Sequence, residues 1–181
     1  MRELTYYIGM TIDGYIAGPG GETDLFPTPD DVMAFIGAEY PETLPTHVRE
    51  ALGIDAPNRR FDTVVMGRAT YQPALDAGIE HPYAHLDEYV VSSAGPERDP
   101  VALVRRLKAM DGLGVWLCGG GRLAAALLGE IDELVVKQYP VVAGAGIPLF
   151  AGSYTPSAFT LVEARPFASG AVVHTYRPAT Y

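Results

Sequence analysis

Three glycines and an arginine join an apolar segment to an alanine-rich one in the stretch GVWLCGGGRLAAALLG, residues 114–129. Glycine loses more conformational freedom on folding than any other residue, so a run of three needs a physical reason. Where a buried strand meets a helix, unpaired N–H groups and the helix macrodipole favour a phosphate, and glycines let it approach the backbone. Arg122 follows at once and can add a charge-assisted contact. The stretch predicts an anion site, with a ligand-free tight turn as the alternative.

Two further segments combine an apolar run with polar groups at its end. VVMGRATY, residues 64–71, places Gly67, Arg68 and Thr70 after a β-branched run, and the run at 88–93 ends in two serines. Three strand ends that offer glycine, arginine or hydroxyl groups fit an extended anionic ligand better than a single phosphate.

Two known phosphate-binding patterns serve as comparisons. GGGRLA satisfies the dinucleotide fingerprint G-x-G-x-x-A from Gly119 to Ala124, but that fingerprint belongs after the first strand, with an acidic residue about 20 positions later. Here it follows the fourth or fifth expected strand, and the chain near that distance reads VVAGAG. An ordinary Rossmann domain is therefore disfavoured, and the G-x-x-x-x-G-K-[ST] sequence of a P-loop does not occur.

The elements that position these residues alternate along most of the chain. Apolar, β-branched runs indicate strands, and amphipathic stretches with capping residues indicate helices. Asp30 or Asp31 is expected to cap the first helix. The expected strands are 4–10, 63–67, 88–93, 114–118, 133–142, 159–167 and 171–178, and the expected helices lie within 27–40, 46–52, 100–110 and 122–128. Alternation predicts a largely parallel sheet, and the closing run of strands predicts antiparallel pairs. We expect one α/β domain over residues 1–181.

Composition limits the function classes. Thirteen basic against twenty-two acidic residues give a net charge of −9, which argues against nucleic acid or an anionic membrane as partner. The single cysteine, Cys118, excludes an internal disulfide and is expected to fill the core. His81 and His85 have no evident third ligand, so we expect no metal site. The first ten residues lack a signal-peptide pattern, and we expect a cytoplasmic protein.

The motifs together resemble the dihydrofolate reductase superfamily. VVMGRATY, the strand ending VVSS, and VWLCGGGRL occur in that superfamily's order. MTIDGYIAGPGGETD, PVVAGAGIPLF and FTLVEARPFASGAVVHTYRP are more similar to its branch typified by the reductase domain of riboflavin biosynthesis. The resemblance implies a central, mostly parallel sheet of about eight strands flanked by helices. It also implies an NADPH cofactor and a homodimer.

The resemblance also implies which residues bind the cofactor. Arg68 would recognise the 2′-phosphate that distinguishes NADPH from NADH, and the three glycines would lie along the pyrophosphate and nicotinamide ribose. The full set of implied cofactor contacts is Ala17, Gly67, Arg68, Thr70, Ser92, Ser93, Gly119, Gly120, Gly121, Arg122 and Leu123.

Reduction of a C=N or C=O bond needs a proton source as well as a hydride. Pro29, Asp31 and Phe35 match the superfamily pattern P-x-D-[LV]-x-x-F, which makes Asp31 the first candidate donor and Asp24 its rival. Simple N-capping is the alternative role for Asp31. Phe26 and Phe35 are the implied substrate contacts. Phe26, or Leu25 if the register slips, stands where the superfamily usually has tryptophan, and Ala124 stands where it has an aromatic residue; both changes argue against folate.

We therefore expect an NADPH-dependent reductase of a small heterocyclic or carbonyl substrate, pterin-like or ribosylamino-pyrimidine-like. The alternatives are a non-catalytic NADP(H)-binding sensor or assembly subunit of the same fold, and a structural dimer with an empty cleft.

Overall fold

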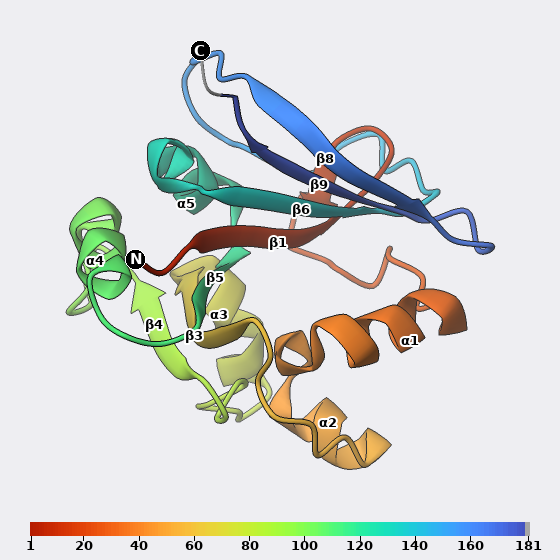
Figure 1. The fold of residues 1–181 in the computed structure, drawn as a ribbon, viewed down its shortest axis with the longest axis horizontal. Helices are drawn as coiled ribbons and strands as arrows, with labels where there is room; N and C mark the ends of the chain where they lie inside the picture. The colour runs from red at the N-terminus through yellow and green to blue at the C-terminus, as the bar shows by residue number, and fades with distance from the viewer. Residues whose placement is uncertain (180–181) are drawn as a thin grey trace.

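The computed structural model, which describes residues 1–179, is an α/β fold built on a large twisted sheet (Figure 1). Its strands are β1 (Leu4–Met10), β3 (Phe61–Gly67), β4 (Asp87–Val91), β5 (Gly114–Gly119), β6 (Glu133–Gln138), β8 (Phe159–Pro166) and β9 (Val172–Pro178). Within the described residues they form a seven-stranded sheet in the order β4-β3-β5-β1-β6-β9-β8. Two short strands, β2 (Tyr15–Ala17) and β7 (Ile147–Pro148), pair separately.

The strands from β4 to β6 are parallel to one another, and β9 is antiparallel to both of its neighbours. β1 pairs in parallel with β5 and β6, and β3 does so with β4 and β5. β9 runs antiparallel to both β6 and β8. The predicted mostly parallel sheet with an antiparallel C-terminal end is confirmed. The large sheet has seven strands rather than about eight, and the short strand β2 was not among the expected strands.

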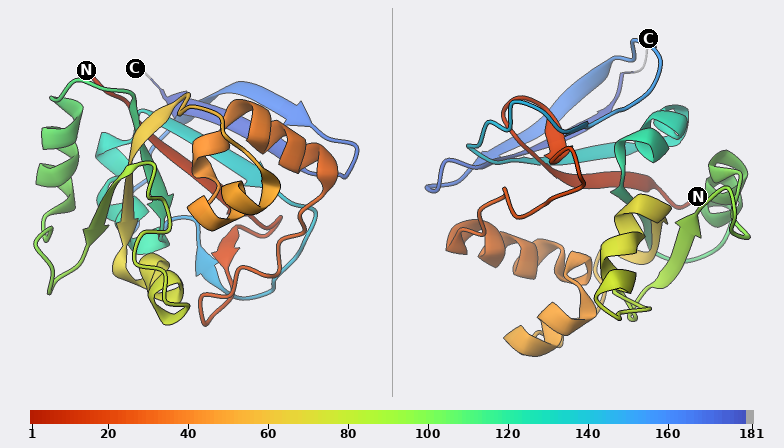
Figure 2. Two further views of the ribbon diagram at one scale, coloured as in Figure 1. Left: turned by 90° about the horizontal axis from the view of Figure 1, so that it is seen from below. Right: turned by 180° about the vertical axis from the view of Figure 1, so that it is seen from behind.

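Helices cover both faces of the sheet, as the views in Figures 1 and 2 show. The helices are α1 (Asp30–Glu39), α2 (Thr46–Leu52), α3 (Arg68–Asp76), α4 (Pro100–Lys108) and α5 (Gly121–Ala126), with 3-10 turns η1 (Pro41–Thr43) and η2 (Leu128–Glu130). Apolar side chains of α4 and α5, such as Leu107 and Leu123, pack in one core cluster. Val32 and Ile36 of α1 pack with Tyr139 in a cluster on the opposite face.

The start of α1 differs from the expectation that Asp30 or Asp31 caps it. The N-cap residue is Pro29, and no side chain accepts a hydrogen bond there. Both aspartates lie inside the first helical turn, so neither occupies the capping position. Asp99 does cap α4, where its carboxylate accepts hydrogen bonds from two backbone N–H groups. Helix α1 therefore begins at Asp30, and Pro29 rather than an aspartate occupies the N-cap position.

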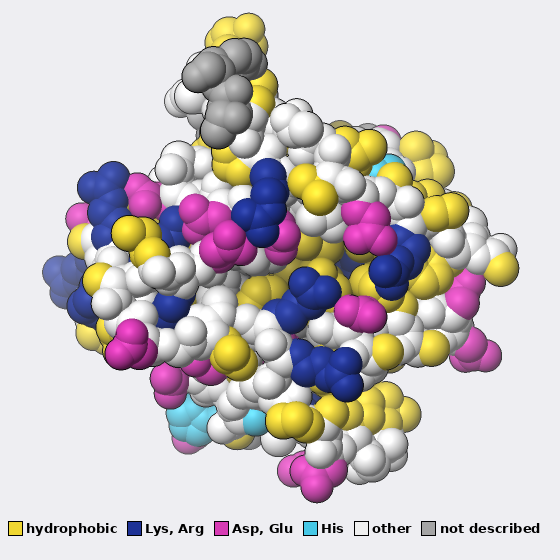
Figure 3. Space-filling view, viewed as in Figure 1, with side chains coloured by type: hydrophobic (Ala, Val, Ile, Leu, Met, Phe, Trp, Pro, Cys, Tyr) yellow, Lys and Arg dark blue, Asp and Glu magenta, His cyan; other side chains and the backbone are white. Residues whose placement is uncertain are grey.

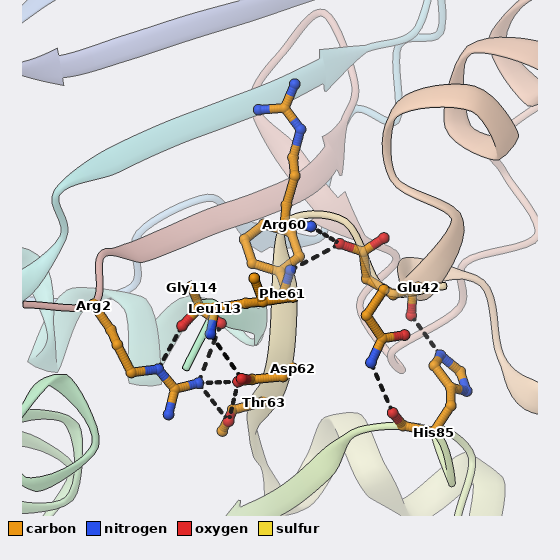
Figure 4. A network of polar contacts seen from close by, with 10 residues as sticks. Arg2, Glu42, Arg60, Phe61, Asp62, Thr63, His85, Leu113 and Gly114 are labelled. Carbon is orange, nitrogen blue, oxygen red and sulfur yellow. Dashed lines mark hydrogen bonds and ion pairs between the residues drawn. The ribbon is translucent and has the colours of Figure 1, made fainter. Parts of the chain in front are cut away.

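A polar network ties together the amino ends of three neighbouring strands (Figure 4). Arg2, just before β1, pairs with Asp62 of β3 and donates a 2.7 Å hydrogen bond to the Thr63 hydroxyl. Asp62 also accepts a 2.7 Å hydrogen bond from the N–H of Leu113, next to β5. These bonds hold the three strands together at their amino ends.

Glu42 joins η1 to the start of β3 in the same view (Figure 4). Its side chain is fully buried, and one carboxylate oxygen accepts hydrogen bonds from the N–H groups of Arg60 (2.6 Å) and Phe61 (2.8 Å). A ring nitrogen of His85 contacts its backbone oxygen at 2.8 Å. Burial lowers the pKa of His85. This histidine therefore has a structural role between two chain segments.

Charges of both signs are interspersed on the face shown in Figure 3. Hydrophobic side chains are visible between the basic and acidic ones, at the floor of a hollow near the middle of that face. Among residues 1–179, no helix combines the length and the apolar character that crossing a membrane requires. The same part of the chain contains no group of three or more His, Cys, Asp or Glu side chains placed to hold a metal ion.

Candidate functional site

The carboxyl ends of β3 and β5 lead directly into helices at the same edge of the sheet. Gly67 is the N-cap residue of α3 and Gly120 that of α5, and neither helix has a side-chain cap. A Cβ built on Gly67 would lie 3.8 Å from both the Gly119 oxygen and the Gly120 nitrogen, so the two helix starts are adjacent. Helix amino ends without side-chain caps leave backbone N–H groups available to an anion.

Gly119 requires glycine for conformational reasons and lies beside the Thr70 side chain. Its φ of +140° lies in a region that residues with a side chain rarely adopt. The Thr70 hydroxyl lies 3.6 Å from the position a Cβ would take at Gly119, and 3.5 Å from that at Gly120. A side chain at either glycine would therefore fill the space in front of Thr70. This open backbone edge fits the predicted approach of a dinucleotide phosphate.

Gly121 has a different explanation from its two neighbours. A Cβ at this position would collide with the Pro148 oxygen and would lie 3.3 Å from the Ala151 Cβ. The Gly121 oxygen also accepts a 2.9 Å hydrogen bond from the Ala151 N–H. Close packing of the segment after β7 therefore accounts for the third glycine of the run, and its cofactor contact stays a prediction.

Arg68 and Ser92 lie at this same carboxyl edge. Arg68 is the first residue of α3, exposed, with its Nε donating a 3.1 Å hydrogen bond to Gln72. Ser92 follows β4, and its hydroxyl accepts a 3.2 Å hydrogen bond from the Ala94 N–H. Because β3 and β4 pair in parallel up to Gly67 and Val91, both side chains flank the edge. Ser93 comes next and is exposed.

Three further predicted cofactor contacts have side chains placed in other ways. Arg122 lines a groove of about 780 Å³ with Phe150 and Tyr176. The Leu123 side chain is buried in the core, which leaves only its backbone for a ligand. Ala17 is buried in β2, paired with β7. Arg122 and Leu123 directly follow Gly121, and Ala17 is connected to it through β7, whose Pro148 oxygen lies against Gly121, so the contacts of these three residues stay predictions.

Asp31, the first candidate proton donor, is held by backbone groups. Its carboxylate accepts hydrogen bonds from the N–H of Ser169 at 2.9 Å, in the turn between β8 and β9, and from the N–H of Val32 at 2.8 Å. These bonds, the one from Ser169 first, lower the pKa of Asp31. These bonds favour the ionised carboxylate and tie α1 to the β8–β9 turn, and the role of Asp31 as proton donor stays a prediction. Asp24 is exposed in the loop between β2 and α1.

The two phenylalanines predicted to touch substrate occupy different places. The Phe26 ring lies 5.3 Å from that of Tyr139, and it borders the space above Gly9. Phe35 packs between Tyr40 and Phe167, with ring centroids 5.6 and 5.4 Å away. Phe26 therefore lies beside the carboxyl end of β1, whereas Phe35 faces the β8–β9 hairpin.

Lys137 of β6 is a polar residue of this region that the sequence analysis did not single out. Its Nζ lies 3.8 Å from the centroid of the Tyr7 ring. Burial lowers the pKa of Lys137 to about 7, against an opposing effect of Cys118. A signal for it exists in the sequence ELVVKQ, since strand alternation puts this lysine on the same face as the buried Val135.

The strand order of the sheet and the glycine run at the carboxyl end of β5 are those of an α/β protein of the dihydrofolate reductase-like class. Residues 80–173 match the RibD C-terminal domain, and the chain belongs to that family. Along 97% of its length it is 27% identical to YwjB of Bacillus subtilis (strain 168), covering 98% of that protein. YyaP of the same strain is 25% identical over 97% of this chain and 94% of YyaP.

Two solved structures share the fold. One, from Shewanella sp. PV-4, is described as a riboflavin biosynthesis protein; it has a TM-score of 0.68 and 23% identity, with 99% of this chain and 100% of that chain covered. The other is a diaminohydroxyphosphoribosylaminopyrimidine deaminase/5-amino-6-(5-phosphoribosylamino)uracil reductase from Thermotoga maritima, with a TM-score of 0.65 and 15% identity. The match covers 98% of this chain and 57% of the Thermotoga chain.

Proposed function

We propose that the protein is an NADPH-dependent reductase of a small heterocyclic or carbonyl substrate. The observation that carries this proposal is the open edge where Gly67, Gly119 and Gly120 meet, with two helix amino ends that no side chain caps. Membership of the RibD C-terminal domain family supports an oxidoreductase. The reductase named in the Thermotoga protein suggests ribosylamino-pyrimidines as the first substrates to test.

The residues at this edge fit the parts of a dinucleotide. Backbone N–H groups after Gly67 and around Gly120 would bind phosphate oxygens, and the exposed guanidinium of Arg68 would pair with the 2′-phosphate. Ser92 and Ser93 would contact the same phosphate region. NADPH bound here would supply a hydride to the substrate. The substrate itself would lie near Phe26, beside the carboxyl end of β1.

Isotope transfer tests the proposal directly. The protein is incubated with NADPH carrying deuterium at the transferable C4 position and with a panel of cyclic imines, ribosylamino-pyrimidines and small ketones. We expect one reduced product to gain one deuterium, measured by mass spectrometry. Binding of NADPH without transfer to any compound would instead support the non-catalytic sensor or assembly subunit, and lack of binding would contradict both.

A further inference from the structure

Lys137 lies on β6 next to Gly9 of β1 and Val173 of β9, its partners in the two strand pairs. Its side chain lies over the Tyr7 ring, with Nζ 3.8 Å from the ring centroid. Within residues 1–179, none of the ion pairs or side-chain hydrogen bonds includes Lys137. Lys137 is half-buried, and an ammonium partly withdrawn from water without an anionic partner is unfavourable, so this placement needs an explanation.

The other lysine of the chain shows how the fold usually treats a buried ammonium. Lys108 is more deeply buried than Lys137, and its Nζ contacts the Asp132 carboxylate at 2.6 Å and donates to the Glu130 oxygen at 2.6 Å. Lys137 has neither kind of partner in the described part of the chain. Its ammonium therefore remains available to a group that arrives from outside.

The titratable groups around Lys137 come from the elements packed against it. Tyr7 projects from β1, Cys118 from β5, and Tyr139 follows β6 directly. Tyr40, after α1, stacks on Tyr7 at 4.4 Å. The β9 neighbour Val173 is apolar. These groups are neutral at pH 7, and burial raises the pKa of Cys118 to about 11.

Gly9, the β1 partner of Lys137, brings the backbone close to two aromatic rings. A Cβ at Gly9 would lie 3.3 Å from Tyr139 and 3.9 Å from Phe26, so both rings pack beside the carboxyl end of β1. Lys137 is the last residue but one of β6, at the carboxyl edge that also carries Gly119. A substrate lying against Phe26 would therefore be close to the lysine and to the proposed cofactor edge.

We propose that the Lys137 ammonium donates the proton to the oxygen or nitrogen of the substrate's reducible double bond. This inference rests on the proposed function, in which NADPH supplies the hydride to the carbon. As the C=O or C=N π bond breaks, its electron pair moves to the oxygen or nitrogen. That atom takes a proton from Nζ, and the neutral amine then regains a proton from water.

The acidity of Lys137 agrees with this role. Desolvation by burial lowers its pKa to about 7. A general acid is most effective when its pKa lies near the working pH, because enough of it is protonated and the proton leaves easily. Turnover should accordingly be lost as the pH rises through the pKa of Lys137.

The chain has two lysines, so the ionisation of Lys137 can be observed without any substrate. We would label lysine with carbon-13 at Cε, record the two signals by NMR against pH, and assign them with Lys137→Met. We expect the Lys137 signal to titrate near neutral pH. A Lys137 signal that titrates near the ordinary lysine pKa of about 10.4 would overturn the inference.

Variants test the proton transfer itself. Lys137→Met should retain NADPH binding and lower the rate of deuterium transfer about 100-fold or more. Lys137→Arg keeps the charge but does not release a proton, because the pKa of arginine exceeds about 12. It should therefore lose kcat with little change in KM, and it also serves as the second variant if Lys137→Met does not fold.

The possible failures are distinguishable. Wild-type transfer by both Lys137 variants would overturn the inference and leave the proposed function intact. Loss of transfer in Asp31→Asn together with normal transfer in Lys137→Met would restore the assignment of Asp31 as donor and overturn that of Lys137. Absence of transfer by the unmodified protein would contradict the proposed function, and the inference with it.

Discussion

The glycines of the run at 119–121 are required for different structural reasons. Gly119 has a backbone conformation that favours glycine, whereas Gly121 is glycine because the segment at Pro148 and Ala151 packs against it. The sequence predicts an unusual junction here, but it carries no information on which distant segment lies against it. That contact depends on β7 and its loop, which no local pattern announces.

Gly121→Ala should destabilise the protein because the added methyl group collides with a backbone oxygen that cannot move freely. We expect a loss of about 1–3 kcal/mol in the free energy of unfolding, measured by urea denaturation. Gly129→Ala is the matched control, since nothing lies within 4 Å of its added Cβ. Equal stability of the two variants would contradict the close packing described for Gly121.

Asp13 gives the fold a pH dependence in the acid range. Its carboxylate accepts hydrogen bonds from the Thr11 hydroxyl (2.6 Å) and from the N–H groups of Ala143 (3.1 Å) and Gly144 (2.7 Å). These bonds, that of Thr11 first, lower the pKa of Asp13 from 3.8 to about 2. A lowered carboxyl pKa contributes stability that is complete above the unfolded pKa and is lost as the pH falls through the folded one.

Asp13→Ala should therefore lower Tm at pH 7, and the difference from the unmodified protein should narrow between pH 3.8 and about 2. Melting curves recorded across that range measure it. Asp55→Ala, which removes an exposed carboxylate, is the control and should lack this pattern. A difference that stays constant down to pH 2 would show that the Asp13 charge has no part in holding the loop.

At the scale of elements, periodicity and capping patterns predict most of the fold. The helix expected at 46–52 has those bounds, and the strand expected at 4–10 does as well. The short β2 was missed because three residues in a glycine-rich stretch carry too little pattern to stand out. The N-cap of α1 was placed wrongly because an aspartate after a proline resembles a cap in sequence.

The link from η1 to β3 depends on one buried carboxylate. Glu42→Ala would leave the N–H groups of Arg60 and Phe61 without their acceptor, so we expect a loss of roughly 2–4 kcal/mol in the free energy of unfolding. Glu42→Gln keeps an acceptor oxygen and should lose less. Urea unfolding of the two variants measures the difference, and a Glu42→Ala variant as stable as Glu42→Gln would contradict the role of these bonds.

The candidate site was predictable in part. Gly67, Arg68 and Gly119 stand at strand ends, and parallel pairing brings strand ends to one edge, so the position of these residues at one edge of the sheet follows from the sequence. The position of Lys137 and the hydrogen bonds of Asp31 could not be predicted from the sequence, because they depend on how α1 and the β8–β9 turn pack against the sheet.

At the scale of the whole molecule, the homodimer stays a prediction. The outer edge strand β8 is a candidate interface, since Leu161 and Val162 are 51% and 58% exposed there. Exposed edge strands with apolar side chains favour pairing with another chain. Sedimentation at low and high protein concentration would measure the assembly state.

The measurement that tests the account most directly is a titration of the protein with NADPH and, separately, with NADH. It is followed by melting temperature and by fluorescence of Trp116, which is buried three residues before Gly119. We predict that NADPH at about 100 times its Kd adds about 2.7 kcal/mol of stability. NADH should bind more weakly, because Arg68 then lacks the 2′-phosphate.

Arg68→Ala should remove most of this preference for NADPH. Arg59→Ala is the control and should keep it, because Arg59 bonds the Ala38 oxygen at the end of α1, away from the edge. If neither dinucleotide changes the melting temperature or the fluorescence, that result would contradict the proposed cofactor site. It would contradict the reductase proposal as well.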